Sequence, residues 1–321
     1  MPTLFRRFPT GRLSDSIRAA RTLLQLGWFC GFLSAVPAMA AEEAFSSRAL
    51  APDPEWQGVA GARAATGMEL SAGLGNPAAT ANLDAPGAAF SHLSWAAGLA
   101  REWAAIGGPI AGPVAGMVDG GVLRSSSLEG FDASGNSTGS FSVSEWNLGA
   151  CLATRLGSGF QLGVGARTFH LSDPIAPLEG LGFSAGLAYR LGGTSLGISI
   201  TDQGRNVGDA GYRLPTRWHA GIEVSPGLRR WLVAVAADGN PSGEQALHAG
   251  GILRPFAWLD LQGGATIKAD QGIGATPSAG VSLRQGSFTF QYAYCRAGEL
   301  GSTQQFGLRL ALRKSGSVKA M

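Results

Sequence analysis

The chain has 321 residues, of which 49 are glycine, 45 % are hydrophobic and only 15 % are charged. Such low charge with this hydrophobicity excludes a disordered chain, and three cysteines are too few for a disulfide-stapled miniprotein or a multi-cysteine zinc module. The formal net charge of +3 arises in the first forty residues, which hold five arginines and one aspartate, so the remainder has one more acidic than basic residue. The chain after residue 40 therefore offers no basic surface for nucleic acid, and no nucleic-acid partner is expected.

The first forty residues have the order of a secretory signal. After the arginines, a mostly apolar stretch runs from Leu23 to Val36, and Ala38-Met39-Ala40 fits the A-x-A pattern of a cleavage site. The alternative is a transmembrane anchor, but the stretch is shorter than the roughly 20 residues that span a bilayer. We therefore predict a signal peptide over residues 1–40, cleaved after Ala40.

Residues 41–85 differ in composition from the chain after residue 85. They are rich in alanine and glycine and contain Pro52, Pro54 and Asn76-Pro77. Prolines and glycines at this density interrupt regular structure. We predict an irregular N-terminal segment here, which can hold a short helix.

From residue 86 the chain breaks into short runs in which hydrophobic residues alternate with polar or small ones. In one run Phe160, Leu162 and Val164 share a face, and Gln161 and Arg167 lie on the other. This period of two predicts β-strands with one apolar face. About fourteen runs have it, near 86–96, 100–108, 113–126, 141–155, 159–171, 181–191, 194–202, 214–225, 229–238, 245–254, 257–268, 275–284, 286–296 and 302–313. Many of the joins are too short for a crossover helix, so neighbouring strands are expected to be antiparallel.

Two architectures can use strands of this kind. A soluble β-sandwich buries the apolar faces between two sheets, whereas a transmembrane β-barrel turns them to lipid and keeps a polar lumen. Fourteen strands are many for one sandwich, and aromatic residues such as Trp95, Trp146 and Tyr294 lie towards strand ends. We predict an all-β chain whose residues 86–313 form a transmembrane antiparallel β-barrel of about 14 strands, followed by a basic tail at 314–321.

Several fragments, taken in order and spacing, resemble one family. They are Gly61-Ala62-Arg63-Ala64-Ala65-Thr66-Gly67-Met68, Asn76-Pro77-Ala78, Ser91-His92-Leu93-Ser94-Trp95, Gly139-Ser140-Phe141-Ser142-Val143-Ser144-Glu145-Trp146, Leu214-Pro215-Thr216 with Gly221, Tyr292-Ala293-Tyr294 and Gly298-Glu299-Leu300-Gly301-Ser302-Thr303. The chain departs from the pattern at Gly75, where the family has a tryptophan. With these fragments the chain resembles the PorV/PorQ (UPF0164-like) outer-membrane proteins, which are relatives of the FadL-type barrels.

This resemblance implies a barrel in the outer-membrane lipid, with the segment 41–85 in its lumen or at its mouth. It implies a non-enzymatic role in protein secretion or surface assembly of the type IX kind, with envelope secretion proteins or cargo as partners. The alternative is a FadL-like channel that carries a hydrophobic small molecule across the outer membrane. The residues that the resemblance assigns to binding or gating are Gly61, Ala62, Arg63, Gly67, Met68, Asn76, Pro77 and Ala78.

Four arginines, Arg167, Arg190, Arg284 and Arg309, are candidates for lining the lumen, because they occur within the predicted strands. A ring of such charges can select solutes in a pore. The alternative is a set of solvated charges with no selective role.

Residues with enzymatic chemistry are scarce. Ser184 lies in a G-x-S-x-G pattern, but the pattern falls inside an alternating strand instead of a strand-to-helix turn, which favours a small luminal serine over a nucleophile. The four histidines, at positions 92, 170, 219 and 248, occur singly in separate predicted strands, so no metal site, catalytic residue or cofactor is predicted. Export would leave Cys151 and Cys295 either joined in one disulfide or as two separate thiols.

Overall fold

The computed structural model describes residues 44–312 except 96–97, 173–176, 205–211, 226–229, 270–274 and 297–300. The predicted signal peptide, its cleavage after Ala40 and the predicted basic tail at 314–321 lie outside these described residues. No helix within the described ranges is both long and apolar enough to span a bilayer.

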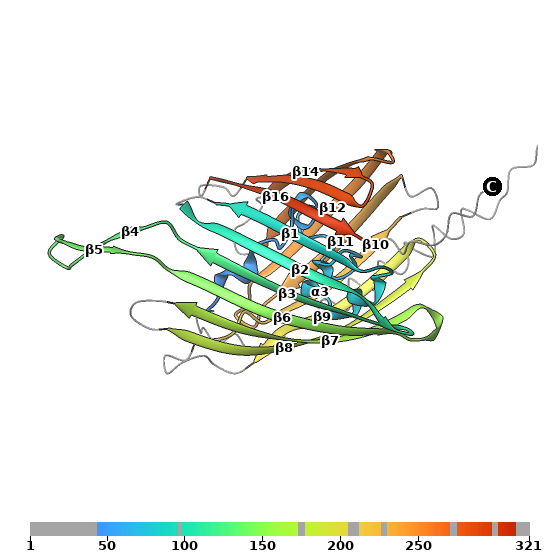
Figure 1. Cartoon of the computed structure of the whole chain (residues 1–321), viewed down its shortest axis with the longest axis horizontal. Coiled ribbons are helices and arrows are strands. Elements are labelled where there is room, and N and C mark those ends of the chain that lie inside the picture. Colours follow the sequence, from blue (N-terminus) through green and yellow to red (C-terminus); the bar gives the residue numbers. More distant parts are fainter. Residues whose placement is uncertain are drawn as a thin grey trace, which may run out of the picture. The chain divides into compact units, whose positions relative to one another are not determined.

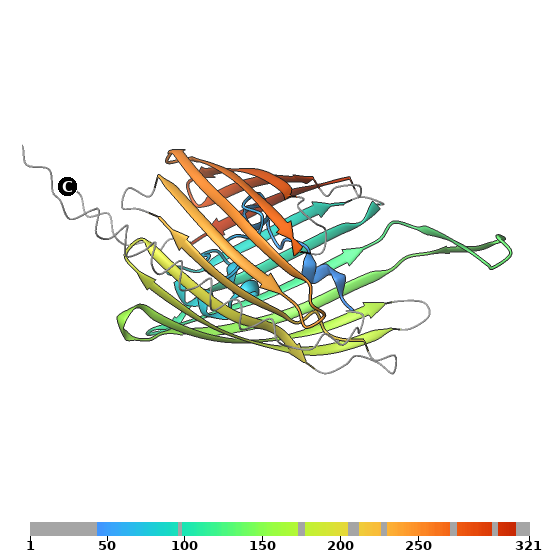
Figure 2. The same ribbon diagram turned by 180° about the vertical axis from the view of Figure 1, so that it is seen from behind.

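In the described part of the chain, fourteen antiparallel strands close into one barrel (Figures 1 and 2). The strands are β1 (Gly87–Ser94), β2 (Ala100–Ala111), β3 (Val114–Arg124), β6 (Ser144–Arg155), β7 (Phe160–Ser172), β8 (Leu178–Leu191), β9 (Thr194–Gly204), β10 (Arg217–Val224), β11 (Trp231–Gly239), β12 (Gln245–Phe256), β13 (Leu259–Lys268), β14 (Ala275–Gln285), β15 (Phe288–Arg296) and β16 (Ser302–Ala311). Each pairs with its neighbours in sequence, and β1 pairs with β16 from Gly87↔Ala311 to Ser94↔Gln304. The predicted 14-stranded barrel is confirmed.

The two faces of each strand differ as the alternation predicts. On β6, Trp146, Leu148 and Leu152 are exposed on the outside, whereas Glu145 and Asn147 are buried on the inside. Large apolar side chains therefore cover the outer wall, and charged groups lie within. This inverted distribution suits a barrel whose outer surface contacts lipid.

A hairpin of two further strands, β4 (Leu128–Phe131) and β5 (Ser137–Phe141), was not predicted from the sequence. It extends from the β3–β6 connection away from the barrel (Figure 1). Its turn is closed by Asp132, whose carboxylate accepts hydrogen bonds from the backbone N–H groups of Ser134 (2.9 Å) and Asn136 (2.8 Å). The segment lacks alternation because it has no core to face, so the pattern that reveals the other strands is missing here.

The two ends of the barrel have different connections. At one end the strands are joined by short turns such as 112–113, 192–193, 257–258 and 286–287. At the other end the connections are longer and include the β4–β5 hairpin. We refer to these as the short-turn end and the long-loop end.

The segment before β1 lies inside the lumen, as predicted, and we call residues 44–86 the plug. It contains η1 (Ser46–Ala49), α2 (Pro54–Gly58), α3 (Ala72–Gly75) and η2 (Pro77–Asn82), drawn in blue within the barrel in Figures 1 and 2. Helix α2 begins at Asp53, whose side chain accepts a hydrogen bond from the N–H of Trp56 (2.8 Å), with proline in the first turn. Val59, Ala62 and Ala78 have no exposed surface, so the plug fills the lumen tightly.

Candidate ligand cavity and plug network

Arg63 fastens the middle of the plug to the barrel wall. Its Nε donates to Glu223 Oε2 on β10 (2.7 Å) and its Nη1 donates to Glu69 Oε1 (2.8 Å) and to Glu55. Glu55 in turn accepts from Nη2 of Arg309 on β16 (3.0 Å). Two of the predicted residues, Arg63 and Arg309, are thus brought together, and the carboxylates that join them were not predicted.

Carboxylates outnumber guanidinium groups in this cluster. Glu55, Glu69 and Glu223 lie on Arg63, and Asp53 lies 3.9 Å from Arg309, in a site where the Glu55 and Arg63 side chains are less than one-tenth exposed. Burial, and then the neighbouring carboxylate of Glu69, raise the pKa of Glu55 to about 8. A proton on Glu55 therefore reduces the repulsion among the buried carboxylates.

Arg167 ties a second part of the plug to the wall. From β7 its guanidinium makes two hydrogen bonds to Asp119 on β3 (2.8 and 2.9 Å) and one to Asn147 on β6 (2.6 Å). Its Nε lies 3.7 Å from Asp202, which also accepts from Nε of Arg48 in the plug (2.7 Å). Arg167 is buried, so its charge interacts with these partners and is not accessible to a solute in the lumen.

The other two candidate arginines have different surroundings. Arg190 contacts the plug near the short-turn end, where its guanidinium donates to the carbonyl of Thr66 (3.3 Å) and lies 2.7 Å from the sulfur of Met68. Arg284 of β14 forms an ion pair with Asp260 of the neighbouring strand β13, at the short-turn end. The four arginines therefore form no ring; each has a separate partner.

The predicted fragment Asn76-Pro77-Ala78 has a structural role in the plug. The Asn76 carboxamide accepts from the N–H of Ala78 (3.0 Å) and donates to the carbonyls of Ala65 (2.9 Å) and Leu187 (3.1 Å). It thus caps η2 and joins two turns of the plug to β8. Gly67 is also packed tightly, since a Cβ there would lie 2.9 Å from the Cβ of Ala72.

The departure from the family pattern at Gly75 has a physical reason in this chain. A Cβ at position 75 would overlap the carbonyl oxygen of Ala64 and lie 2.7 Å from the ring of Trp56. A side chain there is excluded because the Trp56 indole occupies the space.

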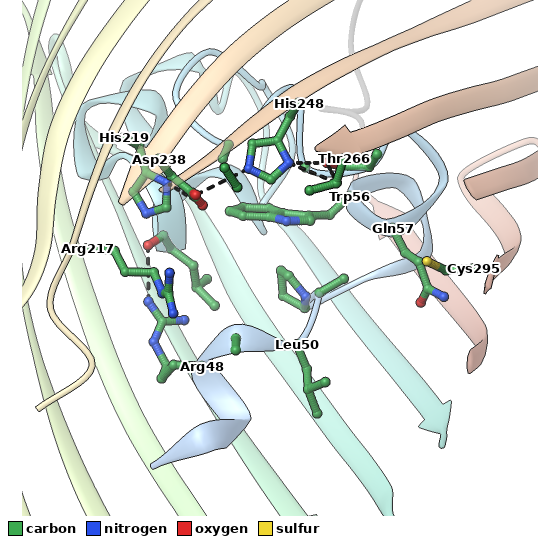
Figure 3. A pocket seen from close by; sticks show the side chains of 18 of the residues that line it. Arg48, Leu50, Trp56, Gln57, Arg217, His219, Asp238, His248, Thr266 and Cys295 are labelled. Carbon is green, nitrogen blue, oxygen red and sulfur yellow. Dashed lines mark hydrogen bonds and ion pairs between the residues drawn. The ribbon is translucent and has the colours of Figure 1, made fainter. Parts of the chain in front are cut away.

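A cavity of about 500 Å³ lies between the plug and the wall, near the long-loop end (Figure 3). Apolar side chains that line it include Leu50, Trp56 and Leu74 from the plug, and Leu93 of β1 with the adjoining Trp95 from the wall. Gly61, one of the predicted binding residues, also lines it, with positive φ (78°) and next to His248 and Trp56. The cavity has the size of small-molecule sites, and its lining combines these apolar side chains with charged ones such as Arg48, Arg217 and Lys268.

One edge of the cavity is polar. Strand pairing places His219 of β10 opposite Asp238 of β11, and His248 of β12 two residues further along. His248 Nε2 lies 3.3 Å from Asp238, and its Nδ1 lies 2.7 Å from the carbonyl oxygen of Ala60. Sequence reasoning treated these histidines as isolated; the structure brings two of them to one aspartate. Within the described residues, no group of His, Cys, Asp and Glu is arranged to hold a metal ion.

No protein-family model and no curated protein matches the chain, but solved structures match it in fold. It aligns with the Ralstonia pickettii toluene transporter TbuX at a TM-score of 0.57 and 12 % identity, over 81 % of this chain and 98 % of TbuX. The P. putida toluene transporter TodX aligns at a TM-score of 0.57 and 11 % identity, over 81 % of this chain and 100 % of TodX. A Pseudomonas aeruginosa FadL homologue aligns at a TM-score of 0.53 and 12 % identity, over 84 % of this chain and 99 % of the homologue. The chain has the FadL-type barrel fold. This part of the predicted resemblance is confirmed at the level of fold, and its PorV/PorQ part stays a prediction.

Within this FadL-type barrel, Ser184 is a luminal strand residue. Its hydroxyl accepts a hydrogen bond from the N–H of Asp202 (3.0 Å), and β8 continues past it to Leu191. The strained strand-to-helix turn that exposes a hydrolase serine is therefore not formed at this position. Two of the structural neighbours named above, TbuX and TodX, are toluene transporters.

The two described cysteines of the FadL-type barrel are both free. Cys151 on β6 is buried, with its sulfur 3.6 Å from the carbonyl oxygen of Gly73, whereas Cys295 on β15 is half-buried and lines the cavity. The alternative of two separate thiols is the one that the structure has.

A small methanethiosulfonate reagent is therefore expected to modify Cys295 much faster than Cys151 in the folded, detergent-purified protein. Cys295 is reached through the cavity, and Cys151 is sealed between the plug and the wall. Peptide mass mapping after a timed reaction measures both sites, and Cys295→Ser should remove the rapid adduct. Equal rates at the two cysteines would contradict the described position of the plug.

Proposed function

We propose that this chain is an outer-membrane channel that carries hydrophobic small molecules, and that the cavity is their binding place on the route. The observation that carries the proposal is a cavity of about 500 Å³ between the plug and the barrel wall, with an apolar patch that includes Trp56 and Leu93. A secretion scaffold does not need a small-molecule cavity, whereas a channel for hydrophobic compounds needs a dry place for them.

The direction of transport is inferred from the two ends of the barrel. Bacterial outer-membrane barrels have short turns on the periplasmic side and long loops outside the cell. On this orientation the cavity faces the exterior and takes up ligand there. The Arg63 cluster and η2 close the route beneath it, so passage requires the plug to shift.

The titles of the fold neighbours support small apolar cargo, since two are toluene transporters and one is a monoaromatic hydrocarbon channel. At 11–13 % identity these proteins are similar to the chain in fold alone, so the evidence for the kind of cargo has to come from the cavity itself. Here the site agrees with the analogy, because Trp56, Leu93 and Trp95 line a space suited to a single ring.

The proposal includes the predicted targeting. Residues 1–40 act as a signal peptide cleaved after Ala40, and the apolar outer wall is covered by outer-membrane lipid. Of the predicted binding or gating residues, we assign Gly61 to the cavity and Arg63 to the plug anchor. We assign Asn76-Pro77-Ala78 with Ala62 and Gly67 to the packing of the plug, and the exposed Met68 to a contact with Arg190 on the wall.

Uptake of radiolabelled toluene by cells that make the protein tests the function. Ala246→Trp places an indole in the cavity from β12 and should lower uptake to the level of cells without the protein. The matched control is Ala249→Trp on the outward face of the same strand, which should leave uptake unchanged. Wild-type uptake no higher than that of empty cells would refute the channel.

A second candidate function, assistance to protein secretion or surface assembly, draws on the β4–β5 hairpin. The hairpin extends beyond the barrel and exposes Phe131 (61 %) and Phe141 (40 %), which are suited to contact another envelope protein. Co-purification in mild detergent, with and without residues 127–142, tests this role. Partners that are lost with the hairpin while toluene uptake is kept would favour it.

A further inference from the structure

We infer that the cavity selects aromatic compounds that carry a hydroxyl group, with the hydroxyl bridging Asp238 and His219 and the ring lying against Trp56. The inference rests on the proposed function and names the class of molecule that the cavity holds most tightly. It depends on three features of the cavity, namely the carboxylate of Asp238, an unpaired imidazole nitrogen beside it and a nearby aromatic ring (Figure 3).

The carboxylate of Asp238 lies close to two histidines. His248 Nε2 is 3.3 Å from Asp238 Oδ1 but makes no hydrogen bond to any described residue, while His248 Nδ1 contacts the carbonyl oxygen of Ala60 (2.7 Å) and the hydroxyl of Thr266 (3.0 Å). The position of the His248 ring is therefore set by its contacts with Ala60 and Thr266. The second oxygen of Asp238, Oδ2, is the one turned to His219.

His219 lacks the partner that a buried imidazole needs. Its Nδ1 is 3.8 Å from Asp238 Oδ2, which is too long for a hydrogen bond, and it has no other hydrogen-bond partner among the described residues. The residue is only 6 % exposed. Buried polar atoms are nearly always hydrogen-bonded, so an unpaired one beside a cavity indicates a group that arrives with the ligand.

The chemistry of the pair limits what that group can be. A carboxylate only accepts hydrogen bonds, so a ligand carboxylate or carbonyl oxygen would face Asp238 without a donor. A hydrocarbon would leave His219 unpaired. A hydroxyl both donates and accepts, so it can donate to Asp238 and pair with Nδ1 of His219 at once.

The ring of such a ligand has a surface to pack on close by. His248 and the Trp56 indole lie next to Gly61 on the same side, since a Cβ built there is 3.4 Å from His248 Nδ1 and from Trp56 Nε1. In Figure 3 the Trp56 ring lies beside the His248–Asp238 pair. A single-ring compound is therefore large enough to reach both, and aromatic rings pack favourably on tryptophan.

The test compares p-cresol with toluene, which differ by one hydroxyl, in equilibrium dialysis against the full chain in detergent. We expect p-cresol to bind at least about tenfold more tightly, as a hydrogen bond to a charged group warrants. Asp238→Asn and, independently, His219→Phe should lower the ratio of p-cresol affinity to toluene affinity towards one.

The matched control is His170→Phe, the same substitution at a histidine that stacks on Trp146 away from the cavity; it should keep the preference. A heat-shifted gel band shows that each variant has folded. Equal binding of p-cresol and toluene by the wild type, or a preference for p-cresol that survives His219→Phe, would overturn the inferred selection for a hydroxyl group. Neither result would contradict the proposed channel function. If neither compound is bound nor taken up, the proposed function fails and the inference fails with it.

Discussion

Replacement of Arg63 by methionine is expected to release the plug from the barrel wall while the ring of paired strands stays intact. The substitution leaves Glu55, Glu69 and Glu223 facing one another in a buried site with Arg309 as the nearest cation. Removing one partner of a buried ion pair typically costs about 3–5 kcal/mol, because the remaining charges stay desolvated. The barrel strands are held together by pairing with one another and not by Arg63. The substitution is therefore expected to weaken the attachment of the plug and not the barrel.

Channel conductance in planar bilayers measures the release. Wild-type protein should conduct poorly because its lumen is filled, and Arg63→Met should show larger and more frequent openings. Arg124→Met is the matched control, since Arg124 is an exposed residue at the end of β3. A variant at position 63 with wild-type conductance would show that the ion pairs do not hold the plug.

A compensated variant separates charge from packing. If Arg63→Met opens the channel because carboxylates are left unpaired, then adding Glu69→Gln and Glu223→Gln should restore much of the closure, since Glu55 keeps Arg309 as its partner. Replacing all members of a buried ionic group with neutral residues is often nearly neutral for stability, unlike the removal of one member. Failure of this rescue would assign the effect to lost contacts of the Arg63 side chain.

The barrel is predictable from the sequence because lipid and lumen impose opposite demands on alternate residues. Phe160, Leu162 and Val164 are exposed on the outside, as their alternation predicts, and Gln161 and Arg167 are buried inside. The same rule explains the missed hairpin. Strands β4 and β5 have solvent on both faces, so nothing enforces alternation there.

The site is only partly predictable, since its pairs join distant parts of the chain. Arg63 can be recognised as a candidate, but its link to Glu223 spans 160 residues and depends on how the plug is seated. His219, Asp238 and His248 are different. They are on three consecutive hairpin strands. Counting from the β10–β11 join places His219 opposite Asp238, and counting from the β11–β12 join places His248 close by, so strand register is the signal that could have found them.

A second substitution with a large expected effect on stability lies at a glycine on the inner wall of the barrel. Gly264 on β13 and Gly250 on β12 are paired across strands, and both lie against Val59 of the plug. A Cβ at position 264 would be 2.6 Å from the carbonyl carbon of Val59 and 2.9 Å from the Cβ of Ala60. The plug backbone can approach this closely only because the wall has no side chain there.

Gly264→Ala should therefore push the plug away from the wall, at a cost of about 1–3 kcal/mol for overpacking. Gly263→Ala is the matched control, one residue along the same strand on the outward face, where an added Cβ meets nothing within 4 Å. It should be neutral or slightly stabilising, because alanine restricts the unfolded chain. Thermal loss of the compact gel band measures both variants.

The same displacement should weaken the cavity. Ala60, which the new methyl group would strike, supplies the carbonyl oxygen that holds His248, and Gly61 next to it lines the cavity. Gly264→Ala is therefore expected to lower ligand affinity as well as stability, whereas Gly263→Ala changes neither. Loss of stability with unchanged affinity for toluene and p-cresol would show that the cavity does not depend on how the plug is seated at Val59 and Ala60. Loss of both would mean that movement of the plug and release of ligand are one event.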